Sequence, residues 1–316
     1  MDDIMQQVRR LQIRTRRQVS DVLSGAYLSV FKGSGVEFDE VRPYVPGDDV
    51  RSIDWNVTAR TGVPHIKRFV EERELSIMLL VDTSSSMDFG SIRQSKRRTA
   101  SELSALVAFS AIANQDKVGV MLFDAQSEHF IPPRKGQKHV LRIIRDVLSE
   151  STAVIAKIDL PWWKRWQNWL FRHQVERVSK KSHLKEGLAF CHRILPKRSI
   201  IFVVSDFLDE GYWETLGMLN SRHDVVLVSI TDPAEYEIPQ VGLLRVVDSE
   251  TGQMLIVDSS TPQAKNLLYQ KHQVQMQHLQ NQARSNGMDL IELSTNQDVL
   301  EPLLAFLKIR EKRGVR

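Results

Sequence analysis

The stretch Leu75-Ser-Ile-Met-Leu-Leu-Val-Asp-Thr-Ser-Ser-Ser86 decides the fold of this chain. Its first seven residues are mostly apolar and predict a buried strand, because short runs rich in Val, Ile and Leu are typical of strands covered on both faces. The run ends at Asp82, and Ser84 and Ser86 follow at alternate positions. We therefore expect one carboxylate and two hydroxyls at the carboxyl end of a strand.

Carboxylate and hydroxyl oxygens are hard ligands, which suit a divalent cation such as Mg²⁺ or Mn²⁺. The alternative is that Asp82 caps a turn and the serines are ordinary turn residues, since both residue types are common there. A second apolar run, residues 199–206, also ends in a carboxylate, that of Asp206. If the two strands are neighbours in a parallel sheet, both acids lie at one edge, which favours a cation site.

The rest of the chain alternates apolar runs with amphipathic segments. The patterns predict strands at 75–82, 117–123, 128–132, 199–205, 223–230 and 288–294. They predict helices at 92–114, 138–149, 183–195, 211–221, 262–286 and 298–310, with a hairpin over 244–257. This alternation is typical of an α/β fold with a doubly wound, mostly parallel sheet flanked by helices.

The first 72 residues have a different pattern. A polar, basic helix is expected at 3–24, followed by a Gly- and Pro-punctuated stretch with short strand candidates. This part is too small for a core of its own. We expect residues 1–72 to form a small β-containing appendage that packs on the main domain, residues 73–316.

The composition is that of an ordinary globular protein, with 42% hydrophobic and 26% charged residues. The single cysteine, Cys191, excludes an internal disulfide framework, and its place in an apolar helical pattern predicts a buried structural thiol. The N-terminus lacks the features of a secretory signal, and no window reaches the ~18 apolar residues that a membrane span needs. A cytoplasmic location is therefore expected, with peripheral contact at the inner membrane face as an alternative.

Residues 151–181 form an insertion that departs from the background composition. Four of the six tryptophans fall within it, and Trp162, Trp166 and Trp169 recur at helical spacing. Residues 157–185 carry eight Lys and Arg against two acids, so this segment holds the positive charge of the chain. The tryptophans either pack the insertion on its own domain or contact a membrane surface or a protein partner. Nucleic acid is not expected as a partner, because no recognised nucleic-acid motif accompanies these residues.

The chain resembles the von Willebrand factor A-like domain, and more closely the bacterial DUF58 proteins. The first resemblance rests on Asp82, Ser84 and Ser86 together with Ser205-Asp206. The second rests on the stretch 42–55, Arg-Pro-Tyr-Val-Pro-Gly-Asp-Asp-Val-Arg-Ser-Ile-Asp-Trp, and on 67–73, Lys-Arg-Phe-Val-Glu-Glu-Arg. The signature or docking residues implied by this resemblance are Arg42, Tyr44, Gly47, Asp48, Asp49, Arg51, Asp54 and Trp55.

The von Willebrand factor A resemblance implies a metal ion-dependent adhesion site, in which three loops surround a Mg²⁺ or Mn²⁺ ion. Asp82, Ser84 and Ser86 match the first loop, and Asp206 matches the acid of the third. Ser182 stands where the second loop usually has a threonine, so it supplies a hydroxyl without the methyl group. The adhesion-site mechanism implies a protein partner whose acidic side chain completes the coordination of the ion.

Asp48, Asp49 and Asp54 allow two interpretations. They are candidates for acid/base chemistry or a second cation site. Their position beside Gly47 favours the simpler interpretation, in which they shape a turn and pair with neighbouring arginines. The sequence alone does not separate a structural or docking role from a catalytic one.

We expect a protein that is not an enzyme, because the chain has no P-loop, no H-E-x-x-H and no G-x-S-x-G motif. The DUF58 resemblance implies association with a MoxR-type AAA+ ATPase in a chaperone-like or complex-assembly role. The predicted function is a non-catalytic, metal-dependent protein-interaction module. The alternatives are a membrane-surface scaffold that docks through the Trp-rich insertion and a hydrolase that uses the ion to activate water.

Overall fold

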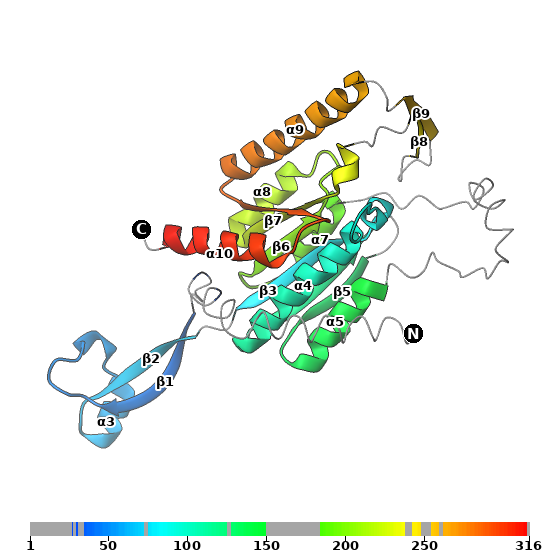
Figure 1. Cartoon of the computed structure of the whole chain (residues 1–316). Coiled ribbons are helices and arrows are strands. Elements are labelled where there is room, and N and C mark those ends of the chain that lie inside the picture. The colour runs from blue at the N-terminus through cyan, green and yellow to red at the C-terminus, as the bar shows by residue number, and fades with distance from the viewer. Residues whose placement is uncertain are drawn as a thin grey trace.

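The computed structural model describes residues 27, 30, 35–72, 75–124, 128–149, 184–237, 242–247, 254–258 and 262–314. A six-stranded sheet lies at its centre, in the order β10-β7-β6-β3-β4-β5 (Figure 1). Its strands are β3 (Ser76–Asp82), β4 (Lys117–Phe123), β5 (Glu128–Arg134), β6 (Ile200–Ser205), β7 (Asp224–Thr231) and β10 (Asp289–Ser294).

The strand order confirms the predicted doubly wound α/β fold. From β3 the chain moves outward through β4 and β5, and then returns to the other side of β3 with β6, β7 and β10. All neighbouring strands are parallel except β4 and β5. The direction of winding therefore reverses between β3 and β6, which is the place where open α/β sheets bind ligands.

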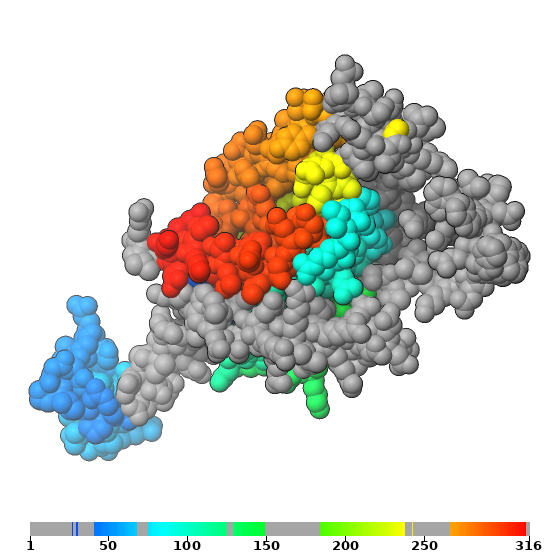
Figure 2. Space-filling view, in the orientation of Figure 1, coloured from blue at the N-terminus to red at the C-terminus, as the bar shows by residue number. Residues whose placement is uncertain are grey.

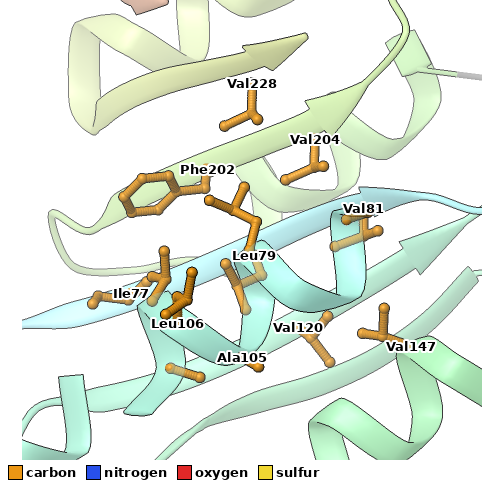
Figure 3. Packing of buried hydrophobic residues seen from close by; sticks show 14 of the residues in the cluster. Ile77, Leu79, Val81, Ala105, Leu106, Val120, Val147, Phe202, Val204 and Val228 are labelled. Carbon is orange, nitrogen blue, oxygen red and sulfur yellow. The ribbon is translucent and has the colours of Figure 1, made fainter. Parts of the chain in front are cut away.

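Helices cover both faces of the sheet. One apolar cluster includes residues of α4 (Lys96–Ala113), α5 (Gln137–Ser149) and α10 (Leu300–Gly314). The other includes residues of α7 (Leu184–Ile194), α8 (Trp213–Arg222) and α9 (Pro262–Ser285). Strand side chains alternate between faces, so β3 gives Ile77, Leu79 and Val81 to the first cluster (Figure 3) and Met78 and Leu80 to the second. This two-sided burial explains why the strand is apolar throughout.

Strand β5 forms one edge of the sheet and runs antiparallel to β4. It contains Pro132 and Pro133, which have no backbone N–H to donate. Gly119 of β4 lies close to it, and a Cβ there would stand 2.8 Å from the carbonyl oxygen of Ile131. The prolines thus sit where edge strands tolerate them.

Most of the 42–55 signature lies in the connection between the two strands of a second sheet. β1 (Gly35–Pro43) pairs antiparallel with β2 (His65–Glu72), and the connection contains η2 (Val50–Ser52) and α3 (Trp55–Thr61). It lies to one side of the six-stranded sheet (Figure 1). The expected β-containing appendage is therefore present, while the boundary at residues 72/73 stays a prediction.

Most predicted elements are found within two or three residues of their expected ends. The predicted hairpin forms from β8 (Leu243–Val247) and β9 (Met254–Asp258), and Cys191 is fully buried as expected. The helix predicted from residue 92 is wrong at its start, because Ser95 caps it by accepting from the N–H of Arg98 and α4 begins at Lys96. The predicted helix at 3–24 and the insertion at 151–181 lie outside the described residues.

Candidate functional site

Asp82 and Asp206 come together at the carboxyl edge of the sheet. Asp82 ends β3, and Asp206 directly follows β6, its parallel neighbour, in which Val204 stands opposite Val81. The hydroxyl of Ser205 donates to Oδ2 of Asp82 over 2.8 Å. The condition set by the sequence, that the two strands be neighbours, is therefore met.

The carboxylate of Asp82 is fully buried. Its Oδ1 accepts from the backbone N–H of Ser84 over 2.8 Å. Burial and the charge of Asp206 raise the pKa of Asp82 to about 6, against hydrogen bonds from Ser84 and Ser205 that lower it. Asp82 therefore shapes the turn, as the alternative interpretation expects. It also lies close enough to Asp206 for the two negative charges to repel each other.

The two predicted serines share one small volume. Ser84 and Ser86 are buried, and their hydroxyl oxygens lie 3.0 Å apart. Thr83, between Asp82 and Ser84, points instead to β4, since its N–H and its hydroxyl both donate to the carbonyl of Phe123, over 2.8 and 2.9 Å. The hydroxyl of Thr83 therefore anchors the turn to β4, whereas the hydroxyls of Ser84 and Ser86 are the candidate ligands.

A buried lysine lies in the site, and sequence analysis missed it. Lys96, the first residue of α4, has no exposed surface, and its Nζ lies 2.7 Å from Oδ2 of Asp206 and 2.6 Å from Oε1 of Glu235. Burial lowers the pKa of Lys96, but the charges of Asp206 and Glu235 outweigh this and hold it above its usual value. The ammonium is therefore charged and divided between two carboxylates.

The next residue, Arg97, holds the backbone of the turn. Its Nη2 donates to the carbonyl oxygens of Thr83 and Ser84 over 2.9 and 3.1 Å, and its Nε pairs with Asp88 at 2.6 Å. The carbonyls of the Asp82–Ser86 turn are thus oriented by a charged donor, which fixes the turn without using the hydroxyls of the serines.

Asp232, at the end of β7, joins the surrounding loops. It accepts from the N–H and hydroxyl of Ser91, from the N–H of Ala234 and from the hydroxyl of Thr295. Glu235, the partner of Lys96, accepts in turn from the N–H of Asp232 over 3.0 Å. In Figure 2 the atoms coloured for the start of α4 and its preceding loop lie beside those near residue 235. One network therefore links the ends of β6, β7 and β10 with the loop 89–95.

Large apolar side chains are exposed on the loops around this network. Phe89 and Ile92 on the loop before α4 are 42% and 72% exposed, and Leu208 after β6 is 51% exposed. The backbone N–H of Leu208 donates to Oδ1 of Asp206 over 3.4 Å, and the carbonyl of Phe89 accepts from the N–H of Lys96. Apolar surface thus flanks the charged cluster on two sides.

The donor types fit a hard divalent cation. Asp82, Asp206 and Glu235 with the ammonium of Lys96 carry a net charge of −2 when all are ionised, which a divalent cation balances. Within the described ranges no group of three or more His, Cys, Asp or Glu side chains could hold a metal ion, so a cation here would depend on hydroxyl ligands. The predicted second-loop ligand, Ser182, lies outside the described residues.

The signature acids make turns, caps and pairs. Arg42 donates from two nitrogens to Asp48 over 2.8 and 2.7 Å, and Asp49 caps η2 by accepting from the N–H of Arg51. Asp54 caps α3 and pairs with Lys67 at 3.2 Å. These contacts agree with the turn-shaping interpretation.

Three other signature residues surround this turn. Gly47 adopts a φ of +111°, and the N–H of Tyr44 donates to the carbonyl of Pro64. Trp55 at the start of α3 is 69% exposed, so most of its side chain faces solvent. The signature thus combines a hydrogen-bonded turn with an exposed aromatic side chain.

The described residues bear on only one of the two predictions about membranes. No helix in the described part of the chain is long and apolar enough to cross a bilayer. Trp162, Trp166 and Trp169 lie in the undescribed insertion, so their membrane or partner contact stays a prediction.

Together, the fold and site define a doubly wound α/β domain with an acidic, hydroxyl-rich cluster where its winding reverses. The chain belongs to the DUF58 family, described as a protein family of unknown function, whose model matches residues 40–278. This confirms the resemblance drawn from the 42–55 stretch.

Relatives and solved structures extend over most of the chain. Uncharacterized proteins of Mycobacterium tuberculosis and Mycobacterium bovis are 27% identical over 306 residues, which cover 96% of this chain and 89% of each relative. The fold is similar to the conserved hypothetical protein BatB from Bacteroides thetaiotaomicron, with TM-score 0.44, 14% identity and coverage of 75% and 99% of the two chains. It is also similar to the VWA domain of SpRpn10, with TM-score 0.38, 13% identity and coverage of 73% and 94%.

Proposed function

We propose that this protein is a non-catalytic, divalent-metal-dependent protein-interaction module. The observation that carries the proposal is the meeting of Asp82 and Asp206 with two buried hydroxyls at the β3/β6 edge. Two adjacent buried carboxylates raise each other's free energy, and a bound cation relieves that repulsion. Mg²⁺ or Mn²⁺ suits this site because both ions favour oxygen ligands.

The residues would share the ion as follows. The hydroxyls of Ser84 and Ser86 bind it directly, and Asp82 and Asp206 bind directly or through water. Ser182 adds a further hydroxyl, as the von Willebrand factor A resemblance implies. When bound, the ion supplies a positive charge with a coordination position that an acidic side chain of the partner fills.

Surface chemistry supports a protein as the partner. The exposed side chains of Phe89, Ile92 and Leu208 flank the site, and apolar surface beside a charged centre is typical of the buried middle of protein interfaces. A partner would therefore place an acidic residue on the ion and apolar residues around it. The DUF58 resemblance suggests a MoxR-type AAA+ ATPase in a chaperone-like or assembly role in the cytoplasm.

The test compares wild type with Asp82→Asn, which keeps the shape of the side chain and removes its charge. Wild type should bind Mn²⁺ in calorimetric titration, and an ion at 100 times its Kd should stabilise the fold by roughly 2.7 kcal/mol over the EDTA sample. Asp82→Asn should lose both responses and remain folded. Glu210→Gln is the matched control, because Glu210 is an exposed acid on the loop after β6, and this variant should behave as wild type.

The partner is tested with a purified MoxR-type ATPase from the same organism. Wild type should retain the ATPase in Mg²⁺ and release it in EDTA, whereas Asp82→Asn should fail to retain it in either buffer. Metal-dependent retention by Asp82→Asn would contradict the proposal. Turnover of phosphoester or peptide substrates by wild type, lost in Asp82→Asn, would favour the hydrolase instead.

A further inference from the structure

We propose that Lys96 is an internal counter-cation that competes with the divalent ion for Asp206, so that the metal-free site stays folded and the ion binds weakly and reversibly. The inference rests on the proposed function, because it concerns the regulation of the same site. No motif in the sequence assigned a role to this lysine. Its position in the structure does.

The location of Lys96 is unfavourable for a lysine without a specific task. It is the first residue of α4, where the partial positive charge of the helix end opposes a cation. It has no exposed surface, so its ammonium has lost its water. Two carboxylates compensate for both effects, Asp206 at 2.7 Å and Glu235 at 2.6 Å. The lysine is therefore held by the same acid that the ion requires.

The charge of Lys96 opposes a second cation nearby. Its ammonium lies against Asp206 in a site shielded from solvent, where charges interact more strongly than in water. Any divalent ion that contacts Asp206 then meets a like charge that is fixed in place. Without the ion, the ammonium offsets the negative charge of Asp206, which otherwise adds to that of Asp82. Lys96 therefore favours the metal-free state over the metal-bound state.

Glu235 gives the ammonium a second position when the ion takes Asp206. One oxygen of Glu235 accepts from Lys96, and the other accepts from the N–H of Asp232. Asp232 in turn binds Ser91 in the loop 89–95 that exposes Phe89 and Ile92. Lys96, Glu235 and Asp232 thus connect Asp206 to the loop 89–95. The cation that pairs with Asp206 is thereby linked to the apolar surface that a partner would contact.

The experiment is a calorimetric titration of the full chain with Mn²⁺, using wild type, Lys96→Met and Arg98→Gln. Lys96→Met removes the ammonium and retains an unbranched apolar stem. Arg98→Gln removes a like charge from an exposed position in the same turn. Lys96→Met should bind Mn²⁺ at least ~10-fold more tightly than wild type, and Arg98→Gln should bind within ~2-fold. In EDTA, Lys96→Met should melt below wild type, and saturating Mn²⁺ should raise its Tm by more.

Glu235→Gln provides a second, opposite test. It removes one negative charge and leaves the ammonium to Asp206 alone, so Mn²⁺ affinity should fall severalfold. This variant keeps the buried lysine, and it decides the matter if Lys96→Met does not fold with or without Mn²⁺. Unchanged or tighter binding by Glu235→Gln would then overturn the proposal.

The outcomes separate this inference from the proposed function. Equal Mn²⁺ affinity in wild type and Lys96→Met would show that Lys96 is structural, while the metal site itself stands. Binding by Lys96→Met but not by wild type would support the role of Lys96 and contradict metal dependence in the natural protein. Absence of binding in both folded proteins, up to millimolar Mn²⁺, would overturn both proposals.

Discussion

Buried carboxylates lie at both ends of the six-stranded sheet, and their surroundings differ. At the amino-terminal edge, Asp116 accepts from the N–H of Leu75 and from the hydroxyl of Tyr27, each over 2.8 Å. At the carboxyl edge, Asp82 has Asp206 as a charged neighbour. Asp116 joins three parts of the chain, whereas Asp82 is placed beside a like charge. A buried acid surrounded by donors serves the fold, and one placed beside another acid retains the capacity to bind a cation.

The carboxyl edge itself contains both kinds of acid. Burial raises the pKa of Asp232, but the hydrogen bonds from Ser91, Thr295 and Ala234 outweigh it and bring the pKa below its usual value. The pKa of Asp82 instead lies at about 6. Both side chains are fully buried, so burial alone does not set the difference. Asp82 has the charge of Asp206 beside it, which raises its pKa, whereas Asp232 accepts from more donors, which lower its pKa.

The largest expected effect of a single substitution on stability is at the amino-terminal edge. Asp116→Ala should lower the free energy of unfolding by about 3 kcal/mol, because it leaves the N–H of Leu75 and the hydroxyl of Tyr27 without this acceptor. Urea denaturation measures the change, and the response to Mn²⁺ should match that of wild type. Tyr27→Phe should lose about 1 kcal/mol. A change in Mn²⁺ affinity in either variant would show that the amino-terminal edge also influences the metal site, which contradicts the division of roles between the two edges.

The second effect depends on pH and also belongs to the amino-terminal edge. Burial, with the charges of Arg222 and His192, lowers the pKa of His223 to about 4, and its Nδ1 accepts from the N–H of Ser199. Between pH 6.5 and 4 the unfolded chain binds this proton and the folded chain does not. The free energy of unfolding should therefore fall as pH falls through this window, by up to about 1.4 kcal/mol per pH unit.

His223→Asn is the matching variant, because asparagine offers an oxygen to the N–H of Ser199 and does not titrate. The difference in unfolding free energy between wild type and this variant should narrow from pH 6.5 to 4. Urea denaturation at each pH provides the measurement. Parallel curves for the two proteins would show that His223 is protonated as readily in the folded state as in the unfolded chain.

A smaller effect is expected for the structural acid of the carboxyl edge. Thr295→Val removes one donor to Asp232 at nearly constant volume and should lower the free energy of unfolding by about 1 kcal/mol. Because Asp232 is joined to Glu235, Mn²⁺ affinity is a second readout and should change by less than in Glu235→Gln. A loss of Mn²⁺ binding as complete as in Asp82→Asn would place Asp232 in the binding site.

The smallest effect on stability is expected for Trp55. Its side chain is 69% exposed, so Trp55→Ala should change the free energy of unfolding by less than about 0.5 kcal/mol. If the signature segment is a docking surface, the same variant should weaken retention of the MoxR-type ATPase. A large loss of stability would instead make Trp55 part of the packing of the chain.

The sequence predicted the fold class and the meeting of Asp82 with Asp206 because both depend on local patterns. Apolar runs of strand length ended in acids, and parallel strands bring such ends to one edge. The pairing of β3 with β6 was a condition that the sequence could not supply, since strand order is set by contacts distant in the chain. The link between Ser91 and Asp232 was missed for the same reason, because 141 positions separate them.

Lys96 was missed through the error in the start of α4. A helix begun at residue 92 puts this lysine in its second turn, where a basic residue is unremarkable. Begun at residue 96, the helix opens with Lys96, Arg97 and Arg98, all of which oppose its dipole. Three cations at the wrong end of a helix indicate nearby acids, and this was the available signal.

The prolines of β5 have a consequence for assembly. A sheet grows by adding a strand to an open edge, and the new strand needs free N–H donors along that edge. Neighbouring N–H groups of a strand point to opposite sides, and Pro132 and Pro133 interrupt the donors of β5 at the place where its pairing with β4 is irregular. Addition of a strand from a second copy, or of an extended peptide, is therefore disfavoured along this part of β5. A chain with this edge resists fibre formation through β5 even when it is crowded beside its own copies.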